Sequence, residues 1–112
     1  MGDEMNYQHR ELASGRWKEL SLTEQMANIG SEVSRALRWQ KKGNSEYCEK
    51  AVSRALELLD LSLECAGSFS QLKEMARLRE AVVDYFYGEN RFSSSEILWR
   101  KYFDHFNYAA RK

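Results

Sequence analysis

The residues in this 112-residue chain best suited to chemistry are an arginine and a histidine near its C-terminus. They are Arg100 and His105, in the stretch Arg100-Lys-Tyr-Phe-Asp-His105. A guanidinium can stabilise developing negative charge, and an imidazole can transfer protons near neutral pH. The alternative is structural, with Arg100 paired to Asp104 or Glu96 on its own helix and His105 partly exposed at the surface.

An arginine followed by four residues and a histidine resembles the signature of the HEPN ribonuclease superfamily, whose members are small helical bundles. The resemblance implies metal-independent RNA cleavage at a dimer cleft, as a ribonuclease or a toxin–antitoxin component. Arg100 would then stabilise the charge that develops on the phosphate, and His105 would move the protons. The chain departs from the family pattern at Lys101, which replaces the polar residue that often follows the arginine.

Short motifs of the common enzyme classes do not occur in the sequence. There is no glycine-rich phosphate loop, no C-x-x-C and no H-E-x-x-H, and no nucleophile elbow. The two histidines and two cysteines lack the spacing of a zinc site. We therefore expect neither a metal nor a cofactor, and any active site would have to be built from scattered residues.

A polar stripe on the first long predicted helix is a second candidate site. Asn28, Glu32 and Arg35 recur at helical spacing, and the simplest interpretation is an i,i+3 ion pair between Glu32 and Arg35. A buried network of all three side chains that fixes one packing register is an alternative, and a catalytic Glu32 is another. Gly30 is expected to allow close helix approach, because a mid-helix glycine costs about 1 kcal/mol relative to alanine.

Aromatic residues are concentrated in the last third of the chain, where nine of the fourteen lie between Tyr85 and Tyr108. Consecutive helical residues point about 100° apart, so not all of them can face one core. Three interpretations stay open: a core with amphipathic tyrosines at the surface, a subunit interface, or a surface that stacks nucleic-acid bases. The interface interpretation assigns six residues: Tyr85, Tyr87, Phe92, Trp99, Tyr102 and Tyr108.

Helices must position these residues, because proline is absent and no segment alternates with the period of a strand. The helix starts are marked by predicted capping boxes, and glycines mark the predicted ends. The boxes are Ser21 with Glu24, Ser68 with Gln71, and Ser93 with Glu96, the last flanked by a staple of Phe92 and Ile97; the glycines are Gly43, Gly67 and Gly88.

The predicted fold is all-α, an antiparallel four-helix bundle (up-down-up-down) over residues 21–112. The predicted helices are joined by connections of about two to six residues, and connections of that length favour antiparallel neighbours. Residues 1–20 form an N-terminal extension, in which residues 7–13 are compatible with a short helix and Trp17 is expected to dock on the bundle.

Charge and cysteine content indicate which partners and which cellular compartment to expect. Basic and acidic residues number 17 each, so there is no general attraction to nucleic acid or anionic lipid. Cys48 and Cys65 fall on one predicted helix, about 25 Å apart, which is too far for a disulfide. Because there is also no signal peptide and no run of 18 apolar residues, we expect a cytoplasmic protein without membrane contact.

Three stretches resemble a family of short bacterial helical proteins. They are Glu24-Gln-Met-Ala-Asn-Ile-Gly-Ser-Glu-Val33, Ala55-Leu-Glu-Leu-Leu-Asp-Leu61, and Lys101-Tyr-Phe with Phe106-Asn-Tyr-Ala-Ala-Arg111. The likeness covers most of the chain from about Arg16 and implies no particular activity. In size and helix count the chain is also similar to the bundle proteins encoded in ribosomal-RNA intervening sequences, which resemble ring-forming oligomers.

The leading functional hypothesis is a non-enzymatic interaction module, a homo-oligomer that associates through its aromatic-rich C-terminal helices. Binding of a further protein partner is compatible with this hypothesis. One alternative is the HEPN-like ribonuclease or toxin–antitoxin component that uses Arg100 and His105. The other is a bundle that binds nucleic acid without cleaving it, through C-terminal arginines and lysines that are interleaved with acidic residues.

Overall fold

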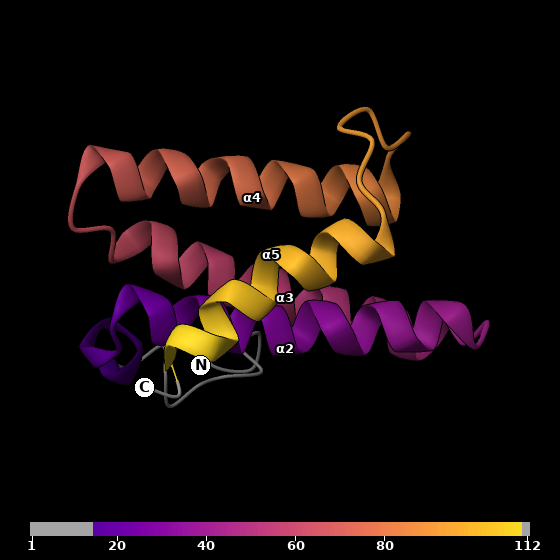
Figure 1. Cartoon of the computed structure of the whole chain (residues 1–112), viewed down its shortest axis with the longest axis horizontal. Coiled ribbons are helices and arrows are strands. Elements are labelled where there is room, and N and C mark those ends of the chain that lie inside the picture. The colour runs from indigo at the N-terminus through magenta and orange to yellow at the C-terminus, as the bar shows by residue number, and fades with distance from the viewer. Residues whose placement is uncertain (1–14, 111–112) are drawn as a thin grey trace, which may run out of the picture.

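The computed structural model describes residues 15–110, and within that range it contains helices and no strand. Four long helices run alternately in opposite directions (Figure 1), which confirms the predicted all-α antiparallel bundle. The predicted helix over residues 7–13 lies outside the described residues. In chain order the elements are η2 (Trp17–Glu19), α2 (Leu22–Lys41), α3 (Ser45–Glu64), α4 (Phe69–Tyr87) and α5 (Glu96–Ala110).

Side-chain caps set the starts of the first three long helices. At α2 the Ser21 hydroxyl accepts from the backbone N–H of Glu24 (3.1 Å), and the Glu24 carboxylate accepts from the backbone N–H of Ser21 (2.9 Å). Asn44 caps α3, and Ser68 caps α4. Each cap satisfies backbone donors that a helix start leaves unpaired. The predicted capping box at Ser21 is confirmed. At Ser68 the predicted N-cap is confirmed but the reciprocal bond is not, because the Gln71 side chain accepts from the backbone N–H of Gly67 (2.9 Å) instead of that of Ser68.

The predicted start of α5 is wrong by two residues. The helix begins at Glu96, and its cap is Ser95, whose hydroxyl accepts from the backbone N–H of Leu98 (3.2 Å). Ser93 instead has a φ of 55°, in the left-handed region that lies outside a helix start. The predicted box of Ser93 with Glu96 is therefore absent.

Tertiary hydrogen bonds in the connection between α4 and α5, residues 88–95, explain this shift. The Asp84 carboxylate accepts from the backbone N–H groups of Arg91 (2.8 Å) and Phe92 (3.0 Å). Asn90 forms a side-chain pair with the backbone of Ser94, donating to its carbonyl (2.9 Å) and accepting from its N–H (2.8 Å). These bonds fold the connection into a compact loop, so the helix cannot begin before that loop is complete.

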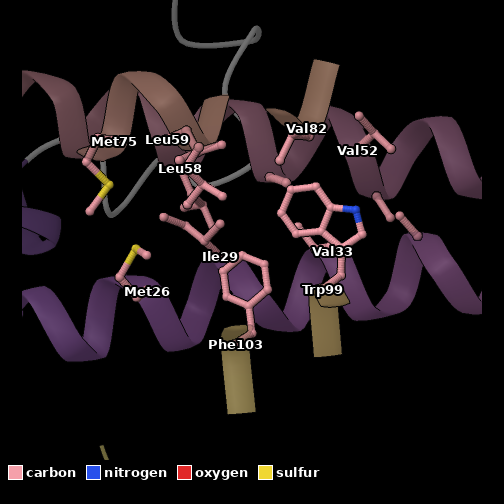
Figure 2. Close-up of a cluster of buried hydrophobic side chains, with 14 of the residues drawn as sticks. Met26, Ile29, Val33, Val52, Leu58, Leu59, Met75, Val82, Trp99 and Phe103 are labelled. Atoms are coloured by element: carbon pink, nitrogen blue, oxygen red, sulfur yellow. The ribbon is translucent and has the colours of Figure 1, made fainter. Parts of the chain in front are cut away.

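The core lies where α3 and α5 pack on α2, while α4 covers α3 on its other side (Figure 1). Trp99 and Phe103 point from α5 into this core (Figure 2), next to Ile29 and Val33 of α2. α4 buries few side chains, namely Met75, Leu78 and Val82. Burial of apolar area at about 25 cal/mol per Å² therefore favours the α2–α3–α5 packing more than the attachment of α4.

A buried polar ring fixes the N-terminal residues of the described chain onto α2 and α3. Trp17 is 1% exposed and donates from Nε1 to the Ser62 hydroxyl (3.0 Å). That hydroxyl donates to Oε1 of Gln25 (2.9 Å), and the Gln25 amide donates back to the Trp17 carbonyl (3.1 Å). Since each buried polar group has its partner, the ring avoids the cost of unpaired groups. The prediction that Trp17 docks on the bundle is confirmed.

α2 and α5 approach each other closely at Gly30, which is buried. A Cβ at this position would lie 2.7–2.8 Å from the Phe103 side chain. A hydrogen atom is thus the largest group that fits there, and this explains a mid-helix glycine whose conformational cost is otherwise unfavourable.

Candidate functional site

Arg100 and His105 are not brought together. Five steps of about 100° around a helix separate two side chains by roughly 140°. Arg100 is held on the α2 side, where its Nε donates to Glu96 (3.0 Å) and its NH1 donates to the Ser34 hydroxyl (3.1 Å). His105 is exposed, with its ring edge against Phe106. The arrangement gives Arg100 a structural role in the α2–α5 seam and offers no joint site for a phosphate.

The polar stripe of α2 is divided between core and solvent. Glu32 is 7% exposed and pairs with Arg35 (Oε1 to NH1, 2.9 Å), as the ion-pair interpretation requires. Asn28 is exposed and donates to the Glu24 carbonyl of its own helix (2.8 Å). The structure therefore does not place Asn28 in a buried network with Glu32 and Arg35.

Several residues of the aromatic cluster form a continuous ladder of ring contacts between buried and half-buried side chains. Tyr85 packs edge-on against Trp99 (6.1 Å between ring centroids), and Trp99 stacks on Phe103 (6.0 Å). The ladder continues through Tyr102 to Phe106. Trp99 is 5% exposed, so its assignment to an interface surface is corrected to a core role. Aromatic pairs contribute about 0.5–1.5 kcal/mol each beyond area burial.

Tyr102 connects α5 to α4 through its hydroxyl, which donates to the Glu74 carboxylate (2.9 Å). Burial raises the pKa of this hydroxyl well above its ordinary value, and the hydrogen bond to Glu74 raises it further. Trp99 makes no comparable bond, because its Nε1 is buried without a hydrogen-bond partner among residues 15–110. Its position is thus fixed by packing.

Three of the remaining interface candidates are exposed, but they do not lie on one face. Tyr87 and Phe92 lie where α4 ends and the connection to α5 begins. Tyr108 lies near the end of α5, at the opposite end of the bundle (Figure 1). Half-buried Tyr85 belongs to the ladder. Only part of the predicted interface set can therefore contact a partner at one surface.

Two further residues join the exposed aromatics at one end of the bundle, where α3 and α5 begin and α4 ends (Figure 1). We call this end of the bundle the end face and define it by Tyr47, Tyr87, Phe92 and Ile97, which are 45%, 52%, 59% and 72% exposed. Tyr87 also lines a shallow hollow with residues from the start of α3. The sequence analysis did not place Ile97 at an interface, because it assigned Ile97 to a hydrophobic staple with Phe92 that depended on the wrong helix start. It assigned no role to Tyr47.

A groove of about 740 Å³ separates α4 from α5. Its apolar part is formed by Leu78 and Ala81 of α4 and by Leu98 and Trp99 of α5. The complete lining is Ser70, Lys73, Glu74, Arg77, Leu78, Ala81, Ser94, Leu98, Trp99 and Tyr102. This groove was not predicted, because its existence depends on the oblique path of α5 across α2 (Figure 1).

Residues 15–110 offer no group of three or more His, Cys, Asp and Glu side chains that could hold a metal ion. Burial raises the pKa of the Cys48 thiol, with a smaller contribution from Glu49, so this thiol is not activated as a nucleophile. Across the same part of the chain, every helix is too short or too polar to cross a lipid bilayer. No protein-family model, curated protein or solved structure matches the chain.

Proposed function

We propose that this chain is a non-enzymatic interaction module that self-associates through its end face. The observation that carries the proposal is the exposure of Tyr47, Tyr87, Phe92 and Ile97 at one end of the bundle. Exposed apolar side chains that gather on one surface mark interaction sites, and Tyr and Phe are enriched at the centres of protein interfaces.

The charges on this end of the bundle favour a second copy as the partner. Lys50 pairs with Glu46 (3.6 Å), and Arg91 pairs with Glu89 (3.7 Å), so both signs are interspersed around the apolar residues. A two-fold contact places a surface against itself, and a surface of one sign would repel its copy. The zero net charge of the chain adds no long-range repulsion between copies.

The contacts of the Arg100–His105 pair supply no support for the ribonuclease alternative. The guanidinium is bound to Glu96 and Ser34, and the imidazole points about 140° away around the helix. The nucleic-acid alternative likewise lacks a described basic stripe on α5, where Arg100 is neutralised by Glu96. Self-association is thus the function that the geometry supports best.

The experiment that tests the proposal is size-exclusion chromatography with light scattering on the full chain. We expect a mass of at least twice the 13.2 kDa of one chain, and Phe92→Glu should return it to the monomer mass. The matched control is Phe69→Glu, which changes an even more exposed phenylalanine (77%) at the opposite end of the bundle and should leave the mass unchanged. A monomeric wild-type protein, or an equal effect of both variants, would overturn the proposal.

A further inference from the structure

The groove between α4 and α5 is a feature that self-association through the end face does not use. In a closed four-helix bundle each helix packs against two neighbours. Here α2 packs on α3 and α5, and α3 packs on α4, but the backbones of α4 and α5 stay apart. Side chains connect the two helices where Tyr85 meets Trp99 and where Tyr102 meets Glu74. Between the helices, core side chains such as Leu78 and Trp99 form the floor of an open channel.

The shape of the groove matches the side of a helix. On α4 its lining residues Ser70, Lys73, Arg77 and Ala81 follow one another at steps of three or four, so they form one stripe. The stripe runs from Ser70 to Ala81, which corresponds to about 16 Å or roughly three helical turns. Channels between two helices receive a third helix by packing ridges of side chains into grooves. An amphipathic helix with apolar residues at i, i+3, i+4 and i+7 presents such a ridge.

The charge on the α4 side of the groove determines which kind of helix can bind there. Lys73 and Arg77 stand one turn apart, and neither side chain forms an ion pair or a hydrogen bond with another residue of the described part of the chain. Arg79 is different, since it points to α3 and pairs with Asp60 (2.8 Å). The one acidic lining residue, Glu74, accepts the hydrogen bond of Tyr102. The α4 side of the groove therefore presents unpaired positive charge beside an apolar floor.

We propose that this groove binds an amphipathic helix of a partner protein, whose apolar stripe covers Leu78, Ala81 and Leu98 and whose acidic flank faces Lys73 and Arg77. The partner differs from a second copy in its chemistry, because it supplies a helix with acidic residues beside its apolar stripe. The site is also separate from the end face, so the protein can bind the helix and self-associate at the same time.

The test uses a labelled synthetic peptide helix of about five turns, with leucines at i, i+3, i+4 and i+7 and glutamates along one flank, titrated with the full-length protein by fluorescence anisotropy. We expect saturable binding that weakens as salt is raised, because surface charge pairs are screened. A control peptide with lysine in place of each glutamate should bind at least roughly tenfold more weakly. The double variant Lys73→Glu, Arg77→Glu should reverse this preference.

Two adjacent residues of α5 provide matched variants. Leu98 lines the groove and is 54% exposed, whereas Ile97 lies on the end face and is 72% exposed. Leu98→Gln should weaken binding of the acidic peptide at least roughly tenfold, whereas Ile97→Gln should bind it as the wild type does. Circular dichroism establishes that both variants are folded, as their exposure leads us to expect.

Three results would overturn the inference: no saturable binding of the acidic peptide, equal binding of the acidic and basic peptides, or unchanged binding by Leu98→Gln. A fourth is a fall in assembly mass caused by Leu98→Gln, which would show that a second copy occupies the groove. Because Phe92→Glu tests self-association without touching the groove, failure of one proposal is distinguishable from failure of the other.

Discussion

Replacement of Gly30 by alanine tests how closely α2 and α5 pack. The new Cβ would lie 2.7 Å from Cδ1 and Cγ of Phe103 and 2.8 Å from its Cβ. These atoms cannot easily move, because the ring stacks on Trp99 and packs against Tyr102. The contact with the Phe103 Cβ means that the backbone of α5 must shift as well. The substitution should therefore separate the two helices locally.

The expected magnitude follows from two opposing effects. Overpacking of a core costs about 1–3 kcal/mol, and the fixed ring of Phe103 places Gly30→Ala in the upper half of that range. Alanine recovers about 1 kcal/mol of helix propensity relative to glycine. The free energy of unfolding should thus fall by about 1–2 kcal/mol. For a domain of this size each kcal/mol lowers Tm by roughly 4–8 °C.

The assay is urea and thermal unfolding followed by circular dichroism, with Ser31→Ala as the control on the exposed side of the same helix. That control should change stability by less than about 0.5 kcal/mol. In a Phe103→Leu background the cost of Gly30→Ala should shrink by about 0.5–1 kcal/mol, because leucine can rotate away from the new methyl group. A Gly30→Ala protein as stable as the wild type would show that the helices do not approach this closely.

Two further changes probe buried and pH-sensitive contacts. Ser62→Ala leaves Trp17 Nε1 and Gln25 Oε1 without their partner, so urea unfolding should show a loss of about 1–3 kcal/mol, whereas Ser53→Ala on the exposed side of α3 should show almost none. Tyr102 has a raised pKa in the folded state, so above about pH 10 the unfolded chain loses this proton first and stability falls as the pH rises. Tyr102→Phe should make that alkaline fall in stability shallower without abolishing it, because burial also raises the pKa of Tyr85 and Tyr87. An unchanged slope between about pH 9.5 and about pH 11.5 would contradict the raised pKa of Tyr102.

The helices could be predicted from sequence because their signals are local. Ser21 and Ser68 cap their helices through contacts only three residues away, so a reading of spacing finds them. The same spacing at Ser93 was misleading, since the backbone there is bound by Asp84 and Asn90 from the preceding helix and loop. A capping pattern therefore predicts a helix start only where no tertiary contact competes for the same backbone groups.

The candidate surfaces were harder to predict, because exposure depends on how the helices cross. Trp99 and Phe92 are both large aromatic residues near the start of α5, yet one is 5% exposed and the other 59%. Composition indicated that the aromatics exceed what one core can bury, which is confirmed by the exposed Tyr87 and Phe92. Which of them face solvent follows from the path of α5 across α2, and no local pattern encodes that path.

The separation of α4 from α5 also shapes how the native state opens. Each of these helices attaches mainly to one neighbour, α4 to α3 and α5 to α2, so either can detach while most of the other's packing persists. Local opening of such units needs less free energy than global unfolding. A helix bound in the groove would contact both, and it would make their opening a single cooperative event. Binding of a helix in the groove would then reduce local opening of both α4 and α5, and so make the C-terminal half of the chain more rigid.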